Sequence, residues 1–63
     1  MNFIKILNAH TDTHWKQVDG PDTRCGIDYY FEDDDGNEAY ANVDQVFWSL
    51  SVNGELLDAG ELQ

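Results

Sequence analysis

The sequence predicts an all-β domain, a small antiparallel meander of five or six strands that is curled or barrel-like. Two observations predict it: stretches of alternating apolar and polar residues, and clusters of Gly, Asn and Asp between them. A flat sheet of this size would lack a closed core, so we expect curvature. With 63 residues, 41% of them hydrophobic, the chain is expected to form a single small domain over residues 1–63.

Three strands are expected in the first half of the chain. Residues 3–7 predict the first and residues 14–18 a weaker second. Residues 19–22, Asp-Gly-Pro-Asp, predict a turn that ends the second strand, because Gly20 tolerates a positive φ and Pro21 lacks the N–H that a strand needs. Residues 24–32 then alternate as a third strand. One face of that strand would carry Cys25, Ile27, Tyr29 and Phe31, and the other Asp28, Tyr30 and Glu32.

The second half predicts two hairpins. Residues 33–37 form an acidic loop from which residues 38–43 return as a strand. Residues 46–52 alternate again, and Asn53-Gly54 is a strong signal for a two-residue turn. Such a turn would set Leu50 opposite Leu57 and Ser51 opposite Leu56. Residues 58–63 contain Gly60 and are expected to form a loose tail or one helical turn.

An alternative for residues 42–50 is a short helix. Asn42 or Asp44 would cap it, and the apolar residues that follow recur at helical spacing. The valines, Phe47 and Trp48 favour a strand. An α+β fold with one short helix at residues 42–50 therefore remains the second possibility.

The net charge of −10 lies entirely in residues 25–63, which contain ten carboxylates and no Lys or Arg. Such a surface attracts basic partners. It does not suit anionic lipids, and no apolar run approaches the roughly 20 residues that span a bilayer, so we expect no membrane association. One cysteine and no signal-peptide pattern lead us to expect a cytoplasmic protein.

Catalytic and metal-binding patterns are missing from the sequence. An alignment of the acidic loop with a calcium-binding EF-hand fails at both anchoring positions, where Phe31 and Asn42 stand. His10, His14 and Cys25 fall short of a four-ligand zinc set. With no nucleophile–base pair either, we expect neither an enzyme nor a cofactor or metal.

The acidic hairpin is the candidate binding site. Carboxylates two residues apart on a strand face stand about 6.6–6.8 Å apart, a spacing comparable with that of nucleic-acid phosphates. Aromatic side chains beside charges make good interface anchors, whereas Trp15, Tyr40 and Trp48 are assigned to packing. The predicted partner-binding residues are Asp28, Tyr30, Glu32, Asp33, Asp34, Asp35, Glu38, Asp44 and Phe47.

Residues 29–40, Tyr-Tyr-Phe-Glu-Asp-Asp-Asp-Gly-Asn-Glu-Ala-Tyr, resemble the acidic hairpins of small phage-encoded DNA mimics. These include inhibitors of uracil-DNA glycosylase and several anti-CRISPR proteins, in which an Asp- or Asn-rich turn ending in Asp-Gly is closely followed by Tyr. The resemblance implies an inhibitor that acts in the host cytoplasm and binds the basic groove of a CRISPR effector or DNA-processing enzyme, without binding nucleic acid itself. Glu32, Asp33, Asp34, Asp35 and Glu38 would replace phosphates.

The alternative function is a small accessory or structural protein-interaction module whose acidity serves solubility. The sequence leaves the choice between monomer and dimer open.

Overall fold

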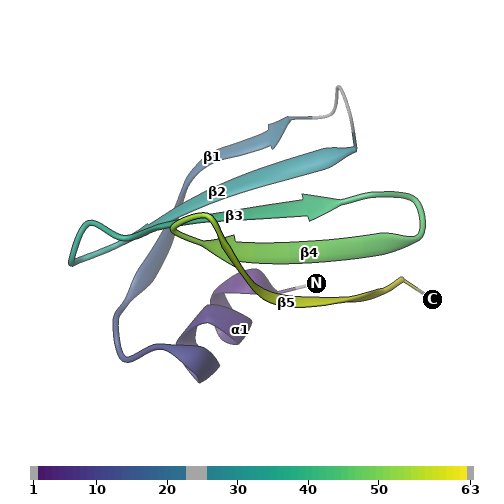
Figure 1. Cartoon of the computed structure of the whole chain (residues 1–63). Helices are drawn as coiled ribbons and strands as arrows, with labels where there is room; N and C mark the ends of the chain where they lie inside the picture. Colours follow the sequence, from purple (N-terminus) through teal and green to yellow (C-terminus); the bar gives the residue numbers. More distant parts are fainter. Residues whose placement is uncertain (1, 23–25, 63) are drawn as a thin grey trace.

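The computed structural model describes residues 2–22 and 26–62. One helix is followed by an antiparallel meander of five strands in the order β1-β2-β3-β4-β5 (Figure 1). The predicted antiparallel meander of five or six strands is confirmed, with five strands. The sheet is open and does not close into a barrel, since β1 and β5 form its two edges. The elements are α1 (Phe3–His10), β1 (Trp15–Asp22), β2 (Ile27–Asp33), β3 (Glu38–Val43), β4 (Phe47–Val52) and β5 (Glu55–Glu61).

The N-terminal segment forms α1, so the strand predicted over residues 3–7 is wrong. Asn2 caps the helix, its side-chain oxygen accepting a hydrogen bond from the Lys5 N–H at 3.1 Å. Phe3 and Leu7 are four residues apart and both buried, which places them on one helix face. A short apolar run fits helix or strand equally well, and here the Asn2 cap and the burial of one helix face both favour the helix.

The helix covers one face of the sheet and completes the core there. The ring of Phe3 lies 5.7 Å from Tyr29, 6.2 Å from Phe31 and 5.9 Å from Trp48, measured between ring centroids. Because these partners come from β2 and β4, Phe3 spans the central strand β3. The core is therefore closed by a second layer rather than by sheet curvature. Its buried residues are Phe3, Leu7, Trp15, Phe31, Ala39, Ala41 and Leu50.

Strand β1 continues to Asp22, which corrects the predicted turn at residues 19–22. Gly20 has φ +100°, and the pairing with β2 shifts register on both sides of Asp19. A β-carbon on Gly20 would collide with the carbonyl oxygen of Asp28. The glycine thus allows a bulge within the strand, and Pro21 is tolerated because β1 is an edge strand. The predicted position of Cys25 lies outside the described residues.

The C-terminal hairpin contains the predicted Asn-Gly turn, with φ 50° at Asn53 and 86° at Gly54. Ser51 faces Leu56 as expected. A register shift follows, so Leu50 faces Asp58 and the predicted pairing of Leu50 with Leu57 is wrong. The helix considered for residues 42–50 is also wrong, because β3, a short loop and β4 occupy them.

Strand β5 extends to Glu61, where a loose tail or helical turn was expected. Gly60 pairs with Trp48, and a β-carbon at this position would lie 2.6 Å from the indole Nε1. The glycine therefore makes room for the tryptophan ring. A glycine weakens a strand pattern in the sequence, which is why residues 58–63 predict a loose tail or helical turn instead.

Candidate functional site

Among the residues that the structure describes, no helix covers the second face of the sheet, which we call the open face. Cross-strand pairs assign its side chains, since residues directly opposite each other point to the same side. Tyr30 pairs with Tyr40, and Tyr40 pairs with Ser51. Nearer the β2–β3 turn, Glu32 pairs with Glu38. The open face therefore combines tyrosines with carboxylates.

Tyr30 and Tyr40 form a ring pair with centroids 5.3 Å apart. The Tyr40 hydroxyl donates to Asp28 Oδ1 at 2.7 Å, and the Asn42 amide donates to the same oxygen at 2.6 Å. The hydrogen bond to Asp28, aided by burial, raises the pKa of Tyr40 above its usual value of 10.0. Asp28 thus fixes the Tyr40 ring, which was assigned to packing but is 38% exposed on the open face.

A groove of about 690 Å³ lies over the tyrosine pair. Its lining includes Val18 and the two tyrosines, and we call it the tyrosine groove. Three carboxylate-bearing residues also line it: Asp19 from β1, Glu32 from β2 and Glu38 from β3. The groove therefore offers aromatic and acidic surface to the same occupant.

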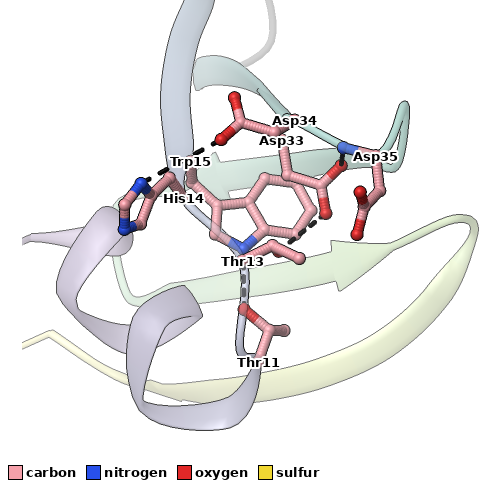
Figure 2. A network of polar contacts seen from close by, with 7 residues as sticks. All are labelled: Thr11, Thr13, His14, Trp15, Asp33, Asp34 and Asp35. Atoms are coloured by element: carbon pink, nitrogen blue, oxygen red, sulfur yellow. Dashed lines mark hydrogen bonds and ion pairs between the residues drawn. The ribbon is translucent and has the colours of Figure 1, made fainter.

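Asp33 is 5% exposed and holds the β2–β3 turn together (Figure 2). Its Oδ2 accepts hydrogen bonds from the Thr13 hydroxyl at 2.7 Å and the Asn37 side chain at 2.8 Å. Its Oδ1 accepts from the backbone N–H groups of Asn37 at 2.7 Å and Asp35 at 3.0 Å. Burial raises the pKa of Asp33, but these hydrogen bonds outweigh it and hold the pKa below 3.8. The structure therefore places Asp33 inside the turn and not on the predicted binding surface.

Asp34 and Asp35 are exposed at the same turn. Asp34 Oδ2 lies 4.0 Å from His14 Nδ1, and both side chains are largely open to solvent (Figure 2). Such an exposed pair contributes little and leaves Asp34 accessible. Glu32 and Glu38 flank the turn on the facing strands. We call this set, Glu32, Asp34, Asp35 and Glu38, the acidic end.

Asp44 and Phe47 lie at the opposite end of the sheet. The Asp44 N–H donates to the Phe47 carbonyl at 2.8 Å, which closes the β3–β4 loop. Phe47 is 57% exposed, as expected. The five-residue rise from Glu38 to Val43 separates this loop from the acidic end by roughly 17 Å. The structure thus brings the predicted residues of the acidic end together and places Asp44 and Phe47 away from them.

Three residues that line the tyrosine groove, Tyr40, Val18 and Asp19, are not in the set that the sequence predicts. A signal for Tyr40 was present, because it alternates with Ala39 and Ala41 and so shares its face with Glu38. Val18 offered no such signal, since it falls at the β1 bulge, between the paired residues Gln17 and Asp19.

No protein-family model matches the chain, and comparisons with curated proteins and with solved structures also give no match. Among residues 2–22 and 26–62, no three His, Cys, Asp or Glu side chains are grouped so that they hold a metal ion. Across the same described ranges, no helix has the length and hydrophobicity needed to cross a bilayer.

Proposed function

We propose that this chain is an acidic DNA mimic that inhibits a nucleic-acid-binding protein by occupying its basic groove. The observation that carries the proposal is the acidic end, where two strands and their turn present four carboxylates together, three of them exposed and that of Glu32 half-buried. Glu32 and Glu38 face each other across the strands, with side chains roughly 5 Å apart at their bases. This density of negative charge resembles that of a phosphate backbone.

A rigid turn favours this function, because a preorganised surface loses less freedom when it binds. The four hydrogen bonds to Asp33 hold the turn in one conformation. Asn53 reinforces it from the neighbouring hairpin, since its amide donates to Asn37 Oδ1 at 2.9 Å and its side-chain oxygen accepts from the Glu38 N–H at 3.0 Å. One aspartate therefore positions the others.

The balance of charges on the open face also supports an interaction with a basic surface. Within the described part of the chain, Lys16 is the basic residue on this face, paired across the strands with Glu32. Charges of one sign steer association with a partner of opposite sign and make it sensitive to salt. The target class we propose includes CRISPR effectors and DNA-processing enzymes.

Affinity capture tests the proposal. The immobilised protein is exposed to bacterial lysate at low salt, and retained proteins are challenged with duplex DNA, guide RNA or salt. We expect a nucleic-acid-binding enzyme that each competitor displaces. Asp34→Asn with Asp35→Asn should reduce its retention about tenfold or more, which corresponds to about 1.4 kcal/mol.

The matched control is Asp44→Asn with Glu61→Gln, which removes two charges from the end of the sheet that carries Phe47. This variant should retain the enzyme nearly as well as the unmodified chain. Equal losses of retention in both variants would show that retention depends on net charge and not on the acidic end. If no such enzyme is retained, or if nucleic acid does not displace it, the acidity serves solubility and the accessory-module alternative replaces the proposal.

A further inference from the structure

We infer that the tyrosine groove is a subsite for an arginine side chain of the partner protein. This inference rests on the proposed function, because it assigns one contact within the same acidic interface. It goes further by naming the partner group, its location over Tyr30 and Tyr40, and the residues that select it.

The aromatic part of the groove suits a planar cation. Tyr30 and Tyr40 are the two rings of the pair, and each is more than one third exposed. A cation within about 6 Å of a ring centroid is attracted by the electrons of its face. Tyr40 is held by Asp28 through the 2.7 Å hydrogen bond, so its ring is already in place. A guanidinium stacks on aromatic faces and is more weakly hydrated than an ammonium, which favours arginine over lysine.

The acidic part of the groove supplies the opposite charge. Glu32 and Glu38 stand directly across from each other and line the groove together with Asp19. Like charges in this arrangement destabilise a sheet, and a cation between them removes the repulsion. Among the described residues no ion pair is formed by Lys16, the nearest basic side chain by register. The two glutamates therefore remain available to an external cation.

The size of the groove fits this occupant. At about 690 Å³ it lies within the range of roughly 300–1,000 Å³ typical of small-molecule sites, so one extended side chain enters with room for water. Its open shape admits a side chain that projects from a protein surface. An arginine that normally contacts a phosphate is such a side chain.

A titration of the isotope-labelled protein followed by NMR tests the inference. The probe is N-acetyl-arginine amide at low salt, and its citrulline counterpart is the neutral control of nearly equal shape. We expect saturable shifts of the backbone signals of Tyr30, Glu32, Glu38 and Tyr40 with the arginine probe only. Shifts spread evenly over all acidic residues, or equal shifts with citrulline, would overturn it.

Variants separate charge from ring contributions. Glu32→Gln with Glu38→Gln should weaken probe binding about tenfold, whereas the matched Asp44→Asn with Glu61→Gln variant should change it less than about twofold. Tyr30→Leu should weaken it roughly three- to tenfold with the charge unchanged. Circular dichroism checks that each variant is folded. If the Tyr30→Leu variant does not fold, the Glu32→Gln with Glu38→Gln variant alone tests the inference. Unchanged binding in the glutamate variant would contradict the inference.

The same variants distinguish this inference from the proposed function. If the arginine probe binds but lysate yields no nucleic-acid-binding enzyme, the arginine subsite is supported and the proposed DNA-mimic function is wrong. If an enzyme is captured and released by DNA, yet its retention is unaffected by Glu32→Gln with Glu38→Gln and by Tyr30→Leu, the mimic stands and the subsite is wrong.

Discussion

The two faces of the sheet are built from the same strands but are filled differently. On β3, Ala39 and Ala41 lie on the covered face, while Glu38, Tyr40 and Asn42 lie on the open face. The alanines leave space for the Phe3 ring, which reaches β2 and β4 across them. On the open face, no second layer is formed by the described part of the chain, so there is room for large polar side chains on the central strand. Side-chain size thus distinguishes the packing face from the interaction face.

Two leucines test the comparison with the largest expected effect. Leu7 is fully buried under the sheet, whereas Leu56 is 67% exposed on the open face. Leu7→Ala should lower the free energy of unfolding by about 2–5 kcal/mol, because it leaves a cavity. Leu56→Ala should change it by no more than about 0.5 kcal/mol. Urea unfolding measures both changes. Similar losses of stability would mean that Leu56 is packed as tightly as Leu7, which would contradict the difference between the two faces.

Two neighbouring aspartates give the next largest effect. Asp33 accepts four hydrogen bonds, so Asp33→Asn should lower the melting temperature by several degrees. Asp34 is exposed among other carboxylates, so Asp34→Asn should leave the melting temperature unchanged or slightly raised. The pKa of Asp33 is lowered on folding, so its carboxylate stabilises the fold above the unfolded value near 3.8.

That stabilisation is lost as the pH falls through the lower folded value. Thermal unfolding as a function of pH should therefore show a smaller acid-induced loss for Asp33→Asn than for the unmodified chain, with Asp34→Asn as the control. Parallel pH profiles for all three proteins would contradict the role assigned to Asp33.

The sequence predicted the hairpins well because their signals are local. Alternation and an Asn-Gly turn locate β4 and the following turn, and the acidic loop locates the β2–β3 turn. The N-terminal helix was missed because residues 3–7 are few enough to fit either period. The sequence predicts a turn at Gly20 and a loose tail or helical turn around Gly60, whereas each glycine lies within a strand and admits a neighbour from another strand. Such close approaches depend on tertiary contacts that no local pattern contains.

The candidate site was predicted in part for the same reason. Alternation placed Asp28, Tyr30 and Glu32 on one face, and the register confirms this arrangement. Burial of Asp33 was not predictable from a run of three identical residues, because the hydrogen bond from Thr13 comes from a segment 20 residues away. The separation of Asp44 from the acidic end likewise depends on the strand pairing.

The smallest expected effect concerns the Tyr40 hydroxyl, which belongs to the open face but is tied to Asp28. Its pKa is raised, so the phenol stabilises the fold fully below pH 10.0, and this contribution is lost as the pH rises through the folded value. Phenolate absorbance should show a titration step above 10.0 that disappears in Tyr40→Phe and moves down in Asp28→Asn. Tyr40→Phe should cost about 1 kcal/mol or less, because the hydrogen bond is partly exposed. Since the ring remains, arginine binding should be preserved in this variant, and its loss would show that the groove depends on the hydroxyl rather than on the aromatic face.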